Sequence, residues 1–264
     1  MRKLNGPEQA KWLLSFDFDG TLHHPGDFPP IPPEFFRAIE RLRTEHCALW
    51  AINTGRGMAH FVEGLLGAGF PFLPDFAVVR ESEIFVPNDF GRWIAMEPWN
   101  RDCEKNHKRF FRKAKRTLAK FRKHIEHETG AEWMHHDIEP AALIARNEEE
   151  MDWICSQLDD LRKALPDLGW QRNTIYLRFG HRAYHKGSAL AEIGRRFAIQ
   201  PERTFAIGDG HNDLQMLDPN VAGAIACPAN AIDEVKRHVA ACGGHVATRP
   251  HGLGVVEALE ALVG

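Results

Sequence analysis

The segment Trp12-Leu13-Leu14-Ser15-Phe16-Asp17-Phe18-Asp19-Gly20-Thr21-Leu22 decides the fold. It begins with an apolar run, and two carboxylates separated by a single residue follow directly. A short apolar run that ends in a polar loop is typical of a buried parallel strand. Because ligands of open α/β sheets bind at the carboxyl ends of the strands, Asp17 and Asp19 stand where a functional site is expected.

The same pattern recurs along the chain. A second apolar run, 47–52, ends in Asn53-Thr54-Gly55-Arg56, and a helical pattern that begins at Pro33 separates it from the first run. We expect further strands at 76–79, 204–207, 224–226 and 245–247, and helices around 57–67, 211–218, 230–240 and 252–262. This alternation predicts an α/β fold with a doubly wound parallel, Rossmann-like sheet.

The middle of the chain has a different pattern. One strand is expected at 92–97, one at 141–146 and a pair of strands over 170–179, together with long helices at about 99–128 and 147–164. We therefore predict an inserted α+β domain over residues 85–182, and a core domain formed by residues 1–84 and 183–264.

The composition is that of an ordinary globular protein. The chain has no run of about 18 apolar residues and no apolar signal segment at its start, so we expect a cytoplasmic protein without a membrane span. Five scattered cysteines without a close pair fit reduced thiols rather than a disulfide framework. A formal net charge of -3 argues against a protein whose whole surface is built to bind nucleic acid.

One stretch departs from that charge balance. Residues 101–123 contain eleven Lys and Arg, a composition that leaves open a polyanion-binding helix. The favoured interpretation is the solvated face of an amphipathic helix, because the stretch and the residues after it carry an apolar stripe at helical spacing, namely Phe110, Ala114, Leu118, Phe121 and Ile125.

Two acidic segments predict a magnesium site. Asp17 and Asp19 lie too close together to be charged comfortably without a cation. Asp209 and Asp213 follow another expected strand and supply two more carboxylates, so that the four together could bind Mg²⁺ and leave room for water and phosphate. A turn or a helix cap would explain either segment alone, but not both. Adjacent histidines at 23–24 and 135–136 are expected to be solvated rather than metal-binding.

Groups suited to phosphate lie near two other strand ends. Thr54 and Gly55 come just after the second strand, where a hydroxyl and backbone N–H groups can hold phosphate oxygens. Lys186 opens the helix that follows the insertion. Taken alone, this residue would be read as an ordinary solvated lysine.

These motifs, in this order, resemble those of the haloacid dehalogenase-like superfamily. The resemblance rests on Asp17 to Thr21, Thr54-Gly55-Arg56, Lys186 and Gly208 to Asp213, and it covers about two thirds of the chain. The second acid of the first motif is typical of phosphatases rather than dehalogenases. Because only about ten residues separate Leu22 from Pro33, a cap domain is expected in the insertion, which resembles the type-IIB cap of the Cof-like and sucrose-phosphatase-like branches.

The resemblance implies a mechanism. Asp17 would attack phosphorus and form an aspartyl-phosphate, while Asp19 would protonate the leaving alcohol and later activate water. Magnesium would be bound by Asp17, the Asp19 backbone carbonyl and Asp209, with Asp213 acting directly or through water. The transferring group would be held by Thr54, Gly55, Lys186 and Asn212.

The expected activity is hydrolysis of small phosphorylated metabolites, with sugar phosphates as the favoured substrates. The insertion would select the leaving group, and its polar candidates near the return to the core are Arg172, Asn173, Arg178, His181, Arg182 and Tyr184. Two alternatives stay open: a phosphosugar mutase that uses the same Asp17 and Asp19, and a non-catalytic RNA-binding protein that uses the basic helix.

Overall fold

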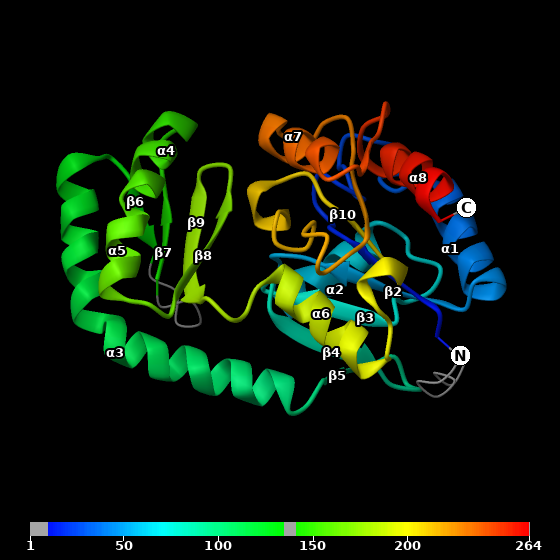
Figure 1. Ribbon diagram of the computed structural model, residues 1–264, viewed down its shortest axis with the longest axis horizontal. Coiled ribbons are helices and arrows are strands. Elements are labelled where there is room, and N and C mark those ends of the chain that lie inside the picture. Colours follow the sequence, from blue (N-terminus) through cyan, green and yellow to red (C-terminus); the bar gives the residue numbers. More distant parts are fainter. Residues whose placement is uncertain (1–9, 135–140, 264) are drawn as a thin grey trace. The chain divides into compact units, whose positions relative to one another are not determined.

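The computed structural model describes residues 10–134 and 141–263. The chain divides into two compact units (Figure 1). The first comprises residues up to Asn100 together with Lys186 and the residues after it, and the second comprises Arg101–His185. Of the residues singled out above, His135 and His136 lie outside the described part of the chain.

The first unit contains an eight-stranded sheet in the order β12-β11-β10-β1-β2-β3-β4-β5. The strands from β12 to β3 are parallel, and β4 and β5 are antiparallel. Their bounds are β1 (Trp12–Phe16), β2 (Ala48–Asn53), β3 (Phe76–Val79), β4 (Glu83–Pro87), β5 (Trp93–Ala95), β10 (Thr204–Ile207), β11 (Ala224–Cys227) and β12 (His245–Val246). This topology confirms the predicted α/β fold with a mostly parallel sheet.

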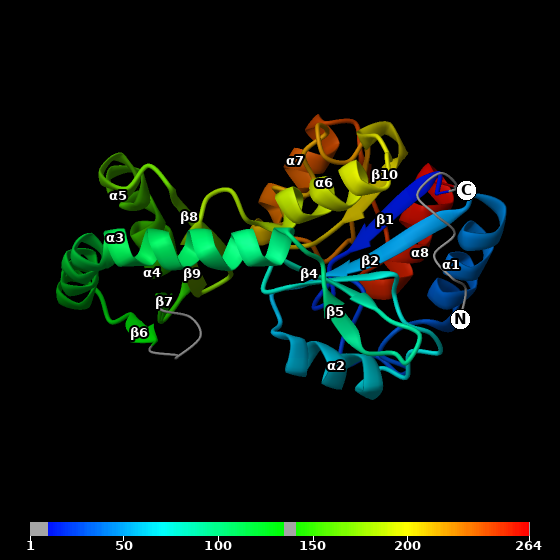
Figure 2. The same ribbon diagram turned by 90° about the horizontal axis from the view of Figure 1, so that it is seen from below.

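Helices cover both faces of this sheet, which makes it doubly wound. One face packs against α1 (Pro33–Glu45), α2 (Met58–Gly67) and α8 (His251–Leu262), and the other against α6 (Lys186–Arg196) and α7 (Asp233–Ala241). In Figure 2, α6 and α7 lie on the side of the sheet opposite α2. Burial on both faces explains why the strands read as continuous apolar runs.

A helix predicted around 211–218 is not formed. Only the short 3-10 helix η3 (His211–Asp213) is present there, followed by turns. The Asp213 carboxylate accepts hydrogen bonds from the backbone N–H groups of Asp209, at 3.0 Å, and Gly210, at 2.9 Å. These bonds hold the chain in a tight loop, so the side chain that would sit in the first helical turn folds back onto the strand end.

The second unit is built on a four-stranded antiparallel sheet in the order β6-β7-β9-β8. Its elements are α3 (Trp99–Glu128, which begins in the first unit), β6 (Glu132–Met134), β7 (Ala142–Ile144), α4 (Glu148–Ser156), α5 (Leu158–Ala164), β8 (Leu168–Asn173) and β9 (Tyr176–His181). The predicted apolar stripe of α3 is buried in the core of this unit, and the basic residues between its members are largely exposed. The amphipathic interpretation of α3 is therefore confirmed.

The units differ in extent from the predicted domains. The insertion was expected over 85–182, but the second unit begins at Arg101. The residues of β4 and β5 that fall within the expected insertion belong instead to the large sheet, where β4 pairs with β3 and β5 pairs with β4, both antiparallel. A hairpin that continues a sheet cannot be told from the start of an inserted domain by its sequence pattern. The helix expected over 147–164 is also interrupted, at Gln157 between α4 and α5.

Within the described residues, no helix combines the length and the apolar character that crossing a membrane requires.

Candidate active site

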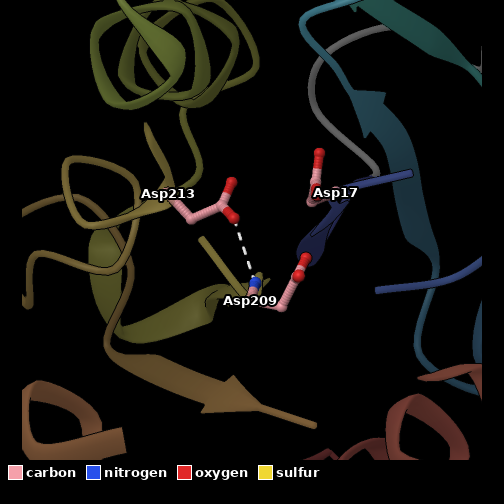
Figure 3. Close-up of side chains that lie close together, drawn as sticks. All are labelled: Asp17, Asp209 and Asp213. Carbon is pink, nitrogen blue, oxygen red and sulfur yellow. Dashed lines mark hydrogen bonds between the residues drawn. The ribbon is translucent and has the colours of Figure 1, made fainter. Parts of the chain in front are cut away.

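Three carboxylates gather at the carboxyl ends of β1 and β10. Asp17 directly follows β1, and Asp209 and Asp213 lie in the loop after β10. One oxygen of each lies within 4.8 Å of the others, and Figure 3 shows the three side chains around a common space. Asp17 and Asp213 are buried, with exposed fractions of 6% and 0%. So close a set of buried acids is costly unless positive charge lies nearby.

The loops that carry these acids are closely packed. Gly208 has no room for a side chain, because a Cβ there would lie 2.3 Å from the Asp213 Cγ atom. Thr21 donates a hydrogen bond from Oγ1 to Asp209 Oδ1 at 2.5 Å, which links the loop after β1 to the loop after β10. These contacts hold the carboxylates in place.

Lys186 supplies positive charge at the centre of the cluster. Its Nζ atom lies 2.6 Å from Asp17 Oδ1 and 2.6 Å from Asp213 Oδ1, and the side chain is fully buried. The start of α6 is also bound to the end of β2, because Asn53 Nδ2 donates to the Lys186 carbonyl at 3.1 Å. The interpretation of Lys186 as an ordinary solvated lysine is therefore wrong.

Burial and mutual repulsion perturb the acids of this cluster. Burial, followed by the nearby Asp213 carboxylate, raises the pKa of Asp17 well above its usual value, although Lys186 opposes the shift. The same two causes raise the pKa of Asp209 to about 6. Burial alone would lower the pKa of Lys186, but the neighbouring carboxylates outweigh it and raise that pKa, so the ammonium stays charged.

The donor set fits a divalent cation. Carboxylate oxygens are the ligands that Mg²⁺ prefers, and three of them converge here. Lys186 compensates part of the negative charge, and the raised pKa values of Asp17 and Asp209 indicate that more positive charge would be favourable. Asp17, Asp209 and Asp213 could therefore hold the ion.

The Asp19 side chain is not part of this cluster. Both of its carboxylate oxygens accept hydrogen bonds from Arg56, at 2.6 Å from Nη2 and 2.7 Å from Nε. The strand ends at Phe16, and the chain turns at Phe18 and Gly20, so the alternation of an extended segment does not continue as far as Asp19. Asp19 is about half exposed, and its environment is set by an arginine rather than by other acids.

The predicted phosphate-binding residues border the cluster. Thr54 is buried at the end of β2, where its hydroxyl accepts a hydrogen bond from the Arg56 N–H at 3.1 Å. Gly55 follows it. Asn212 is buried in η3, and its Nδ2 atom donates to Glu81 Oε1 at 2.9 Å.

Sequence reasoning missed Glu81 and the pairing role of Arg56. Glu81 is buried in the loop after β3, and its charge acts on Lys186. It belongs to no motif, and its neighbours in the sequence carry no signal for it. Arg56 stood within a quoted motif, but its partner Asp19 is 37 residues away.

Three arginines were proposed for the second unit, namely Arg172, Arg178 and Arg182. Arg172 donates to Asp152 Oδ1 at 2.6 Å, and Arg182 donates to the Pro166 carbonyl at 3.3 Å. Arg178 lies on β9 between Leu177 and Phe179, which are both buried in the core under the helices. Because side chains alternate along a strand, Arg178 belongs to the opposite face of the sheet, where it pairs in register with Gln171.

Comparison with known proteins identifies relatives of this chain. A model of the haloacid dehalogenase-like hydrolase family matches residues 73–259. A phosphoglycolate phosphatase from Methanopyrus kandleri is 36% identical over 87 residues, which are 30% of this chain and 36% of that protein. The match thus spans about a third of the length of that curated relative.

Solved structures share the fold. The sucrose-phosphatase from Synechocystis sp. PCC6803, in complex with sucrose and phosphate, has a TM-score of 0.69 at 17% identity, over 96% of this chain and 98% of that one. A sugar phosphatase of subclass IIB of the same superfamily has a TM-score of 0.59 at 19% identity, over 95% of this chain and 98% of that one. At such identities the likeness concerns the fold alone.

Proposed function

The chain belongs to the haloacid dehalogenase-like hydrolase family, and from this premise we propose that it is a phosphatase that hydrolyses small phosphomonoesters, with Asp17 as the nucleophile. The observation that carries the proposal is the buried Asp17 carboxylate at the end of β1, paired with Lys186 and grouped with Asp209 and Asp213. A non-catalytic RNA-binding protein would have no use for this buried, charged arrangement. The phosphatase names of the relatives add further support.

The proposed reaction has two steps. An Asp17 oxygen attacks phosphorus, a P–O bond to Asp17 forms, and the P–O bond to the leaving alcohol breaks while Asp19 donates a proton to that alcohol. Water then attacks the same phosphorus, Asp19 takes the proton of the water, and Asp17 and inorganic phosphate are released. Thr54, the Gly55 N–H, Lys186 and Asn212 would stabilise the charge that spreads over the phosphoryl oxygens.

Magnesium is part of the proposal. Asp17, Asp209 and the Asp19 backbone carbonyl would hold it, with Asp213 as a further ligand or as a support for the others. When bound, the ion would neutralise the repulsion between the carboxylates and a phosphate dianion.

Magnesium affinity is expected to depend on pH. Because the pKa of Asp209 is raised to about 6 without metal, a proton competes with the ion below that pH. Affinity should fall as the pH drops below about 6, roughly tenfold per pH unit for each proton that the ion displaces. Calorimetric titration at pH 5.0, 6.0 and 7.5 measures this. Equal affinity at pH 5.0 and 7.5, or unchanged affinity in Asp209→Asn, would contradict the assignment.

Asp19 is expected to matter most for poor leaving groups. Asp19→Asn cannot donate a proton to the leaving group. The rate of the first step should therefore fall by roughly 10²–10⁴-fold for an alkyl phosphate, and by much less for an aryl phosphate whose phenol is acidic. Rates measured over a series of esters with leaving groups of different pKa test this. An equal loss along the whole series would remove Asp19 from the role of acid.

We propose that the second unit selects the leaving group, with Arg178, on the face of the sheet opposite Leu177 and Phe179, as the candidate contact. Arg178→Ala is expected to lower kcat/KM for the best sugar phosphate roughly tenfold or more, and to change p-nitrophenyl phosphate hydrolysis little, because an activated ester needs little remote binding energy. Arg172→Ala is the matched control, since Arg172 pairs in register with the buried Leu177, on the other face of the same sheet, and binds Asp152. Equal losses on both substrates in Arg178→Ala would exclude a selective role.

A phosphate-release screen tests the proposed function directly. Sugar phosphates, nucleotides and phosphorylated acids are offered with magnesium and with excess chelator. Phosphate release that requires magnesium and no bisphosphate activator is expected for a phosphatase. Transfer to a second position of the sugar, without free phosphate, would indicate a phosphosugar mutase instead.

A further inference from the structure

We infer that Glu81 is a positioning residue of the phosphate site, which fixes the side-chain amide of Asn212 in the orientation needed to donate to a phosphoryl oxygen. The inference rests on the proposed function, because it takes Asn212 to be a phosphate ligand. Glu81 itself need not touch the substrate.

The backbone at Glu81 has a conformation that its side chain does not favour. Arg80 and Glu81 are consecutive residues with φ values of 48° and 64°, in the left-handed region that favours glycine. Such a conformation persists in a longer side chain only where the surroundings enforce it. Residues of this kind cluster at functional sites, so we ask which contacts hold Glu81 in this conformation.

Contacts around Glu81 supply that explanation. Its N–H donates to the Thr54 carbonyl at 3.0 Å, and its Oε1 atom lies 3.4 Å from the point where a Cβ of Gly55 would stand. The same Oε1 accepts the hydrogen bond from Asn212 Nδ2 at 2.9 Å. Glu81, with an exposed fraction of 4%, thus joins the loop after β2 to the loop after β10.

The hydrogen bond to Asn212 determines which way its amide points. A carboxylate offers only acceptors, so the NH₂ group of Asn212 must face Glu81 and its carbonyl oxygen must face away. That oxygen lies over Gly210, where a Cβ would stand 2.9 Å from it. The second hydrogen of Nδ2 then has a defined direction, whereas an amide without Glu81 could turn its carbonyl oxygen toward the phosphate and repel it.

Substitutions at two neighbouring positions separate this role from a structural one. Glu81→Gly removes the carboxylate and also relieves the left-handed backbone, so the protein should fold. Arg80→Gly relieves the same kind of backbone, but the Arg80 side chain pairs with Glu83 at 3.6 Å, whereas the side chain bonded to Asn212 is that of Glu81. Glu81→Gln keeps an oxygen that can accept the Asn212 hydrogen bond.

Activity should be lost only in variants that lose the hydrogen bond to Asn212. Glu81→Gly should lower kcat/KM about tenfold or more and weaken competitive inhibition by inorganic phosphate by a similar factor, since an unheld amide binds phosphate less well. Arg80→Gly should stay within about twofold of wild type and Glu81→Gln within about threefold. In an Asn212→Ala background, Glu81→Gly should cost no more than about twofold, because the two residues act as one unit.

Three results would overturn the inference: wild-type phosphate inhibition in Glu81→Gly, equal losses in Glu81→Gly and Arg80→Gly, or additive losses of Glu81→Gly and Asn212→Ala. Failure of the proposed function has a different signature, namely no phosphate release by the wild type from any ester. In that case calorimetric binding of inorganic phosphate to the wild type and to the variants tests the inference, and wild-type protein that binds no phosphate refutes it.

Discussion

Replacing Asp17 by Asn is expected to abolish phosphate release, with a loss of about 10⁴-fold or more in kcat, because an amide is a far poorer nucleophile than a carboxylate. The other acids of the cluster, Asp209 and Asp213, lie in the loop after β10 rather than at the end of β1, so neither replaces the Asp17 carboxylate at its position. Steady-state phosphate release and acid-quench trapping of phosphorylated protein measure the effect. Near-wild-type release by the variant would refute covalent catalysis by Asp17.

Stability should change in the opposite sense to activity. The raised pKa of Asp17 means that ionising it in the fold is unfavourable; the stability that its protonated form contributes is present at low pH and lost as the pH rises. A neutral amide avoids that loss at pH 7, so Asp17→Asn should be about as stable as the wild type or more stable.

Asp75→Asn provides the matched contrast. Asp75 is a buried acid of the same unit that accepts hydrogen bonds from Trp50 N–H and from Arg43, both at 3.1 Å, and it makes no contact with the acidic cluster. Its substitution should leave kcat near that of the wild type, because Asp75 lies outside the acidic cluster. If both variants lost activity in proportion to their loss of stability, the effect of Asp17→Asn would be structural.

The parts of the site that lie at strand ends were predictable from the sequence. A buried parallel strand is recognised from a local apolar run, and the residue that follows it is then placed at the carboxyl edge of the sheet. This reasoning located Asp17, Thr54 and Asp209. The fold class followed for the same reason, because the alternation of strands and helices is a local pattern.

Contacts between distant loops were not predictable in this way. The bond between Asp19 and Arg56 depends on how two loops turn after their strands, and the turn after β1 begins one residue past Asp17. Glu81 reaches the site through a left-handed backbone that the sequence Arg80-Glu81 disfavours, so local preference opposes the observed structure. Tertiary contacts decide both.

Predictions of the lengths and boundaries of elements were wrong where a single side chain changes the path of the backbone. Asp213 has the position and charge of a residue in the first turn of the helix that was predicted around 211–218. Its carboxylate instead bonds to two N–H groups of the preceding loop and to Lys186. The bonds that hold the Asp213 carboxylate therefore stabilise the loop in place of a helix.

Lys186→Met is expected to cost both activity and stability. Methionine fills a similar volume without charge, and it leaves Asp17 and Asp213 buried together without their shared partner. Removing one partner of a buried ion pair typically costs about 3–5 kcal/mol, which corresponds to roughly 10 °C in a chain of this size. Activity should fall about 10³-fold or more, because a charged donor to the phosphoryl oxygens is also lost.

The exposed Lys163, which pairs with Asp160 at 2.7 Å, provides the control, since Lys163→Met should change the thermal midpoint little.

Loss of the Lys186 ammonium should raise the pKa of the neighbouring acids further. An acid whose pKa is raised in the fold stabilises the fold at low pH, and this stabilisation is lost as the pH rises. The thermal midpoint of Lys186→Met should therefore lie closer to that of the wild type at pH 5 than at pH 8. Magnesium should also raise the midpoint of the variant more than that of the wild type, because the ion supplies the missing positive charge. Thermal unfolding at both pH values, with and without magnesium, measures all of this. A deficit that is independent of pH and magnesium would show that Lys186 stabilises the fold by packing rather than by its charge.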